Sequence, residues 1–246
     1  MHIPKIKNQI IAITGASSGI GRSIAFELST KGALVAVMAR RKDKLIELET
    51  EIHAKLPKAK IIVYEGDIRK KSSTQKFFEF IIKNWGRLDV FVNNAGVTDS
   101  DRFADLSPNQ IQNMINTNFN GSVWALYYAI KIFEENREGT IINISSTLAT
   151  KPYPNASLYA STKSGIHSLI KSLQEDYINH KNIKIINISP GATLTDAFKE
   201  NNHAVNTQNM VLPEDVADFV TYALNSPDNM QITEFSLRQS GQVFNS

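Results

Sequence analysis

Tyr159 and Lys163 are the two residues whose types and spacing point most directly to chemistry. In a helix, a spacing of four places the phenol and the ammonium on one face, within mutual reach. A free tyrosine has a pKa of about 10, which a nearby cation lowers by stabilising the phenolate. The pair therefore predicts a general acid or base, although a Y-x-x-x-K pattern is common by chance.

Ser146 closes a predicted strand that begins at Thr140, and it lies thirteen residues before Tyr159. A hydroxyl at the carboxyl end of a central strand lies where open α/β sheets bind ligands. The neighbouring strands are also predicted to end in polar or glycine-containing segments, at residues 93–96 (NNAG) and 189–191 (SPG). We expect the three strand ends to converge on one crevice.

Residues 14–21 (TGASSGIG) follow the first predicted strand and open a helix. Glycines let the backbone turn sharply and approach a ligand, and a helix N-terminus offers free N–H groups to a phosphate. The spacing G-x-x-x-G-x-G differs from the commonest dinucleotide fingerprint. The same residues also fit the G-x-S-x-G nucleophile elbow of hydrolases, with Ser17 as the nucleophile.

The hydrolase is the weaker hypothesis, because its elbow usually follows a strand well inside the sheet rather than the first strand. It also needs an acid and a histidine downstream. Beyond the first hundred residues the histidines are His167, His180 and His203, and two of them lie in segments with a helical pattern.

Arg40 and Arg41 follow the second predicted strand. An acidic residue there would accept hydrogen bonds from the 2′-hydroxyl of an adenine ribose, whereas arginine suits a 2′-phosphate. A solvated helix start is the alternative interpretation. The pair predicts NADP as the cofactor.

The elements that must position these residues alternate between strands and helices. Short β-branched runs predict strands at residues 10–14, 34–39, 60–64, 88–92, 140–144, 184–188 and 232–237. Helical periodicity is clearest at 19–31, 42–55 and 156–179. These strands are apolar throughout and do not alternate between apolar and polar residues, and helices separate them along the chain. The pattern predicts an α/β fold of the Rossmann type: a doubly wound parallel sheet with helices on both faces. Residues 1–246 show no linker and no repeat beyond the βα unit, which indicates a single NAD(P)-binding catalytic domain.

Composition narrows the function classes. The net charge of +3 is spread along the chain without a basic block, which argues against nucleic acid or an anionic membrane as partner. The absence of cysteine excludes disulfides, thiolate nucleophiles and cysteine-bound metals, and no metal site is predicted. The first nine residues lack a secretory pattern and no apolar run reaches the ~18 residues of a membrane span, so we expect a cytoplasmic protein.

Taken together, these residues resemble the classical short-chain dehydrogenase/reductase family over nearly the whole chain. The matching pieces are TGASSGIG (14–21), NNAG (93–96), Ser146, Tyr159 with Lys163, and PG (190–191). The resemblance implies that the tyrosine exchanges the proton with the carbonyl or alcohol oxygen. It implies that the lysine perturbs the tyrosine and binds the nicotinamide ribose, and that the serine polarises the carbonyl. It also implies a proton relay through water at Asn118, with Asn116 a near neighbour.

The same resemblance implies a set of cofactor contacts. They are Gly15, Ser17, Ser18, Gly19, Ile20, Gly21, Arg40, Arg41, Asp67, Ile68, Asn94, Ala95, Gly96, Tyr159, Lys163, Pro190, Gly191, Thr193 and Thr195. Asp67 would contact the adenine and Asn94 the region near the nicotinamide ribose. Thr193 and Thr195 would hold the carboxamide and the pyrophosphate. Helix capping is the alternative role for Asp67 and for Thr195 with Asp196.

The C-terminal region departs from many family members, because it lacks an acidic residue followed by paired glycines. Residues 213–238 instead resemble the subgroup of NADP-dependent 3-hydroxy acid and serine-type dehydrogenases, which implies a small polar hydroxy acid or keto acid. A carboxylate substrate would need a cation in the pocket. The candidates are Arg102, Lys151 and Lys199, whereas Leu148, Tyr153 and Phe198 could line an apolar pocket for another ketone.

Two further expectations concern regions rather than single residues. The polar stretch 192–212 is long for a connection and is predicted to close over the substrate. The helix at 156–179 is long enough to serve both a core and an interface, and the resemblance implies a homodimer or homotetramer.

The leading hypothesis is therefore an NADP(H)-dependent oxidoreductase that transfers hydride between the nicotinamide and a carbonyl or secondary alcohol. A catalytically silent NADP(H)-binding sensor or regulator is the alternative. Such a protein should have lost one of Ser146, Tyr159 or Lys163, and all three are present.

Overall fold

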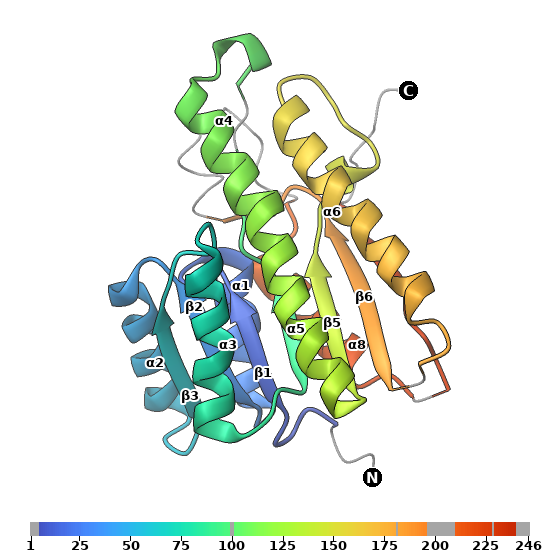
Figure 1. Ribbon diagram of the computed structural model, residues 1–246. Helices are drawn as coiled ribbons and strands as arrows, with labels where there is room; N and C mark the ends of the chain where they lie inside the picture. The colour runs from blue at the N-terminus through green and yellow to red at the C-terminus, as the bar shows by residue number, and fades with distance from the viewer. Residues whose placement is uncertain (1–4, 99–100, 181, 196–209, 228, 240–246) are drawn as a thin grey trace.

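The described part of the chain forms one parallel sheet of seven strands, in the order β3-β2-β1-β4-β5-β6-β7 (Figure 1). The computed structural model describes residues 5–98, 101–180, 182–195, 210–227 and 229–239. The strands are β1 Ile10–Thr14, β2 Leu34–Ala39, β3 Lys60–Glu65, β4 Val90–Asn93, β5 Gly139–Ile144, β6 Ile183–Pro190 and β7 Glu234–Leu237. Strand order reverses between β1 and β4, so the fold is the predicted doubly wound, Rossmann-type α/β fold.

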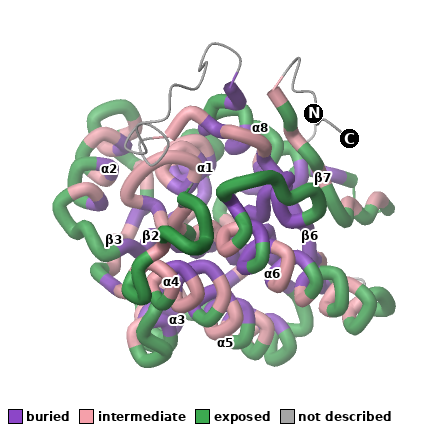
Figure 2. Tube along the Cα trace, turned by 90° about the horizontal axis from the view of Figure 1, so that it is seen from above, coloured by how far each residue is buried: buried purple, intermediate pink, exposed green. Residues whose placement is uncertain are grey.

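Helices cover both faces of the sheet (Figure 2). They are α1 Gly19–Thr30, α2 Lys42–Lys55, α3 Lys71–Trp85, α4 Pro108–Met114, α5 Ser122–Asn136, α6 Ser157–Asp176 and α8 Pro213–Leu224. Helices α1, α2 and α8 pack on one face, and α3, α5 and α6 pack on the other. None of the helices within the described residues has both the length and the apolar character that a membrane span requires.

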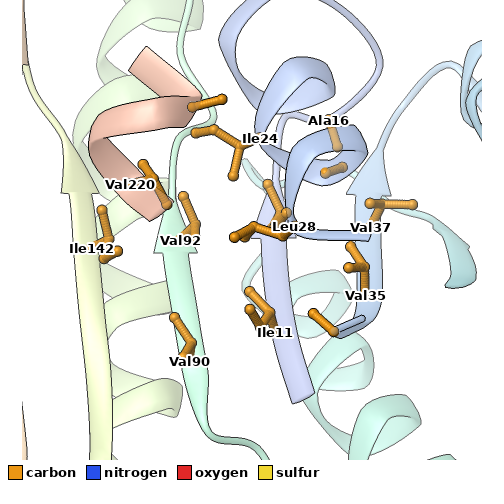
Figure 3. Packing of buried hydrophobic residues seen from close by; sticks show 14 of the residues in the cluster. Ile11, Ala16, Ile24, Leu28, Val35, Val37, Val90, Val92, Ile142 and Val220 are labelled. Carbon is orange, nitrogen blue, oxygen red and sulfur yellow. The ribbon is translucent and has the colours of Figure 1, made fainter. Parts of the chain in front are cut away.

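The two faces of the central strand have separate hydrophobic cores. Every residue of β1 is buried. Ile11 and Ile13 pack in the cluster that includes α1, where Figure 3 shows Ile11 near Leu28. Ile10 and Ala12 pack in the separate cluster on the opposite face. This burial on both sides explains why the strand sequence does not alternate between apolar and polar residues.

Local signals set several helix ends. Helix α3 ends at Gly86, whose φ of 79° is the left-handed conformation common at helix C-termini. Helix α4 begins with Pro108 in its first turn, and Ser107 forms a reciprocal capping box with Gln110. Helix α4 continues into a π-helix over Ile115–Gly121, a rare geometry that often marks functional sites.

Several predicted strand ends need correction. Strand β6 extends two residues beyond the predicted end at 188, and β7 begins at Glu234, two residues later than predicted. Strand β4 begins at Val90, two residues later than predicted. Strand β5 ends at Ile144, so Ser146 lies beyond the strand instead of closing it. The chain turns there into a short 3₁₀ helix over Thr147–Ala149, and the Ser146 hydroxyl caps it by accepting a hydrogen bond from the Leu148 N–H at 3.1 Å.

Candidate active site

A cavity of about 440 Å³ opens at the carboxyl ends of the strands, across the point where strand order reverses between β1 and β4. Residues from the glycine turn, the ends of β2 to β5 and helix α6 line it. They are Thr14, Gly15, Ser17, Ser18, Gly19, Ile20, Met38, Ala39, Arg40, Arg41, Gly66, Asp67, Ile68, Asn94, Ala95, Gly96, Val97, Thr98, Thr117, Ile144, Ser145, Tyr159, Lys163 and Thr195.

The glycine turn fits closely against the loop after β4. Gly15 has a φ of +71°, and a Cβ atom placed on it would lie only 2.7 Å from Ala95 Cα. The Asn94 side-chain amide donates to the carbonyls of Thr14 at 2.9 Å and Gly15 at 3.2 Å. The Thr14 hydroxyl in turn accepts hydrogen bonds from the N–H groups of Asn94 and Ala95, both at 3.2 Å. These contacts join the ends of β1 and β4 beside the cavity.

Arg41 reaches back over the glycine turn. Its guanidinium donates to the hydroxyls of Ser17 at 3.0 Å and Ser18 at 2.7 Å. Arg40 is exposed and makes no hydrogen bond or ion pair within the described part of the chain. Both arginines lie before α2, which begins at Lys42, and both line the cavity.

Asp67 lies in the cavity lining after β3. Its carboxylate accepts hydrogen bonds from the backbone N–H and the guanidinium of Arg69, each at 3.0 Å. The Arg69 side chain therefore lowers the pKa of Asp67. The carboxylate forms a local turn and does not cap α3, whose N-cap is Lys70.

Tyr159 and Lys163 lie on the same face of α6, with the Lys163 Nζ 5.9 Å from the centre of the Tyr159 ring. Burial raises the pKa of Tyr159 to about 12, and a hydrogen-bonding interaction with the Ser146 hydroxyl acts in the opposite direction. Burial lowers the pKa of Lys163 to about 8. The Lys163 ammonium donates to the Ile144 carbonyl at 2.9 Å, and Lys163 is not among the groups that shift the pKa of Tyr159 in this structure.

Asn118 is the asparagine of the π-helix that faces the site. Its side-chain oxygen accepts from the Val97 N–H at 2.8 Å, and its amide donates to the Val97 carbonyl at 2.8 Å and the Thr162 hydroxyl at 3.2 Å. Asn116 instead accepts hydrogen bonds from Gln112 and Asn120 on an exposed surface. The Asn118 side chain therefore holds the loop after β4 against α6.

The structure brings most of the predicted cofactor residues to one cavity but not all of them. Gly21 packs beneath the turn, where a Cβ atom would collide with the Asn94 amide. Pro190, Gly191 and Thr193 are absent from the lining, and the Thr193 hydroxyl donates to the Gly191 carbonyl at 3.0 Å. Sequence reasoning missed lining residues that lie within or directly adjoin the motifs, namely Thr14, Met38, Ala39, Gly66, Val97, Thr98, Thr117, Ile144 and Ser145.

The predicted substrate contacts are only partly described. Arg102 lies 3.9 Å from Asp105 in an exposed ion pair. Tyr153 is half exposed, and its hydroxyl contributes to the raised pKa of Tyr159. Lys199 and Phe198 lie outside the described residues, as does most of the predicted lid.

The ends of the lid segment pair with each other. The Leu194 N–H donates to the Val211 carbonyl at 2.9 Å, and the Val211 N–H donates to the Ala192 carbonyl at 3.1 Å. In the described part of the chain, no cluster of three or more histidine or acidic side chains could bind a metal ion.

A doubly wound sheet with a glycine turn and a cavity at its switch point is the arrangement in which Rossmann-type proteins bind dinucleotides. A model of the short chain dehydrogenase family matches residues 9–206, and the chain belongs to this family of oxidoreductases. An uncharacterized oxidoreductase of Listeria monocytogenes is 30% identical over 246 residues, covering 96% of this chain and 98% of its own length.

Solved structures similar to this chain contain either a phosphorylated nicotinamide cofactor, of the NADP type, or an unphosphorylated one, of the NAD type. An alcohol dehydrogenase of the archaeon Thermococcus sibiricus, complexed with 5-hydroxy-NADP, has a TM-score of 0.86 and 25% identity over 98% of this chain and 100% of that chain. A 3-ketoacyl-(acyl-carrier-protein) reductase of Brucella melitensis, complexed with NADH, has a TM-score of 0.84 and 24% identity over 96% and 98%. The second likeness is evidence of the fold alone.

Proposed function

We propose that this chain is an NADP(H)-dependent oxidoreductase that interconverts a carbonyl compound and a secondary alcohol, with Tyr159 as the general acid or base. The observation that carries the proposal is a single cavity lined by Arg40 and Arg41 as well as by Tyr159 and Lys163. One part of the cavity suits a phosphorylated ribose and another part suits proton transfer.

The residues present fit a phosphorylated dinucleotide. Gly19, with a φ of +54°, opens α1, and a Cβ atom on it would lie 2.9 Å from Thr195 Cγ2, so a side chain would fill the space beside the helix N-terminus. Ser17, Ser18 and the Arg41 guanidinium form a polar, cationic group next to that turn. When bound, the nicotinamide supplies or accepts the hydride.

Residues of the chain itself carry out the proton transfer. In the reductive direction the Tyr159 hydroxyl gives its proton to the carbonyl oxygen as hydride reaches the carbon, and the product is the alcohol. The high pKa of Tyr159 keeps this proton in place at neutral pH. The Ser146 hydroxyl lies beside the phenol and would orient the substrate oxygen, and the Lys163 ammonium would offset charge that develops on the tyrosine.

The next question is which carbonyl compounds and alcohols the enzyme acts on. We propose a small hydroxy acid, such as a 3-hydroxy acid, or its keto acid, on the subgroup resemblance of residues 213–238. The Thermococcus sibiricus neighbour is named an alcohol dehydrogenase, which supports chemistry at a CH–OH group.

The test is cofactor turnover with NADP⁺ and NAD⁺ on a panel of 3-hydroxy acids, hydroxy amino acids and simple secondary alcohols. We expect Tyr159→Phe to lower kcat by about 10²–10⁴-fold while the dissociation constant for NADPH stays unchanged. Tyr127→Phe removes an exposed phenol of α5 that does not line the cavity and is the matched control, with activity largely retained. NADPH binding without turnover on any substrate would favour the silent sensor, and no cofactor binding would overturn the proposal.

A further inference from the structure

An ion pair between Asp67 and Arg69 lies at the edge of the cofactor cavity. The Arg69 guanidinium holds both carboxylate oxygens of Asp67: Nε lies 3.0 Å from each oxygen, and NH2 lies 2.6 Å from Oδ2. The remaining NH1 group donates to the Asn113 side chain of α4 at 2.8 Å. Asp67 lines the cavity, whereas Arg69 does not.

The same carboxylate is close enough to Arg40 for their charges to interact. The pKa of Asp67 is lowered chiefly by its hydrogen bond to Arg69, and the charges of Arg69 and Arg40 also lower it. Arg40 itself has no ion pair within the described residues. Arg40 and Asp67 line the same cavity, and Arg40 belongs to the pair that we assign to the 2′-phosphate.

A bare carboxylate at this position would work against a phosphorylated cofactor in two ways. It would attract Arg40 away from the phosphate, and it would repel the phosphate itself. A ribose 2′-hydroxyl carries no charge and would be affected much less. Two parallel hydrogen bonds from a guanidinium are the most effective way to offset a carboxylate.

We propose that Arg69 is a positioning residue for cofactor choice: it neutralises Asp67, so that Arg40 stays available to a 2′-phosphate and NADPH is preferred over NADH. The inference rests on the proposed function, because it assumes a nicotinamide dinucleotide in the cavity. It goes beyond that function by assigning part of the preference to a residue outside the cavity lining. A merely structural role for Arg69, through its bond to Asn113, would affect both cofactors equally.

The test measures dissociation constants of NADPH and NADH for the full chain by calorimetry and compares the ratio Kd(NADH)/Kd(NADPH). Asp67 and Arg69 are partly exposed, so the effects are modest. We expect Arg69→Gln to bind NADPH about fivefold more weakly and NADH almost unchanged, with the difference shrinking at high salt. Lys70→Gln removes the next positive charge along the chain and is the matched control, with the ratio unchanged.

Three further variants test whether Arg69 acts through Asp67. Asp67→Asn leaves the guanidinium uncompensated and should raise the ratio. The double variant of Asp67→Asn with Arg69→Gln removes both charges and should return the ratio close to the wild-type value. Arg69→Lys keeps the charge without the paired hydrogen bonds and should retain most of the preference. Because Asp67→Asn does not alter Arg69, it keeps the inference testable even if Arg69→Gln fails to fold.

Each outcome separates the two proposals. A wild-type ratio near one overturns the NADP preference, and the inference with it. If the wild type prefers NADPH but Arg69→Gln binds both cofactors more weakly by the same factor, the inference about Arg69 is overturned and the proposed NADP preference stands. The inference also fails if the ratio Kd(NADH)/Kd(NADPH) of the double variant is as low as that of Arg69→Gln, or if Asp67→Asn leaves the ratio unchanged.

Discussion

Lys163 occupies a position that is costly for a lysine. Its side chain is only 8% exposed, and its ammonium has the Ile144 carbonyl as its hydrogen-bond acceptor. A fall of the pKa from 10.5 to about 8 means that burying the charge costs roughly 3 kcal/mol at neutral pH. Such a cost is expected where a site sacrifices stability for chemistry.

We therefore expect Lys163→Met to raise the free energy of unfolding by roughly 1–2 kcal/mol at pH 7, after the lost hydrogen bond is counted. The same variant should lose activity. Between about pH 8 and 10.5 the unfolded chain binds more protons than the folded chain, so the wild type gains roughly 3 kcal/mol as pH rises. This gain exceeds the advantage of the variant at pH 7, so the difference closes and then reverses, and the wild type is the more stable protein above about pH 10.

Urea unfolding of both proteins at several pH values measures this difference. Lys171→Met, an exposed position on the same helix, is the control and should change stability by less than about 0.5 kcal/mol. A Lys163→Met protein that is less stable than the wild type at pH 7, or a difference that does not vary with pH, would contradict the argument.

At the scale of elements, three asparagines form a buried ladder across neighbouring strands. Asn93, Asn143 and Asn187 pair in register on β4, β5 and β6. The Asn93 amide donates to the Asn143 oxygen and the Asn143 amide donates to the Asn187 oxygen, both at 2.8 Å. The ladder lies directly before the strand ends that form the cavity, so it fixes the relative register of three active-site loops.

Asn143→Val should destabilise the fold by about 2–4 kcal/mol, because it leaves a buried donor on Asn93 and a buried acceptor on Asn187 without partners. Ile142→Val, the adjacent buried position on β5, is the control, with a loss of about 0.5–1.5 kcal/mol. Urea midpoints at equal m values give the comparison. Equal losses in the two variants would mean that the ladder contributes only packing.

The bounds of β1, β2 and α2 agree with the sequence prediction, because an uninterrupted apolar run or a regular helical period marks each of them. The π-helix at Ile115–Gly121 has no such local signal. Its geometry depends on contacts between distant segments, including Gly121 against Ile68, where a Cβ atom would lie 2.8 Å away.

The candidate site likewise contains residues that local sequence patterns predict and residues that depend on contacts between distant segments. Motif spacing predicted Tyr159, Lys163 and the glycine turn, because each motif sits within one element. Arg69 and the Lys163 contact with Ile144 depend on how separate elements meet, which single-sequence patterns do not encode. Spacing along a helix indicates that Tyr159 and Lys163 are close, but it does not give the direction of the ammonium, which donates to the Ile144 carbonyl.

For the whole molecule, one continuous sheet supports the proposal of a single catalytic domain over residues 1–246. We also propose that the chain self-associates. On α8, Phe219 and the exposed Tyr222 lie 5.4 and 5.9 Å from the ring of Phe235, which belongs to the edge strand β7. Aromatic side chains exposed beside a sheet edge are typical of interfaces.

Sedimentation should therefore give two or four times the chain mass of 27.4 kDa. Tyr222→Lys should lower that mass if α8 and β7 form the interface. Ile178→Lys, just beyond the C-terminal end of α6, tests the alternative helix in the same way. A monomer at every concentration would contradict both the homodimer and the homotetramer.

Cofactor binding should stabilise the molecule as a whole, because the cavity is built from the turn after β1, the ends of β2 to β5 and helix α6. A ligand that binds only the folded state adds about 2.7 kcal/mol at a hundred times its dissociation constant. For a chain of 246 residues this corresponds to a rise in Tm of roughly 5–10 °C.

At equal concentrations we expect NADPH to raise Tm more than NADH, since only NADPH offers a phosphate to Arg40 and Arg41. Arg41→Gln should reduce the shift with NADPH and leave the shift with NADH nearly unchanged, because its guanidinium lies over Ser17 and Ser18 and away from the reacting groups on α6. Equal shifts with both cofactors in the wild type would place the two arginines outside the cofactor site. The glycine turn and Tyr159 would then belong to an NAD-dependent enzyme.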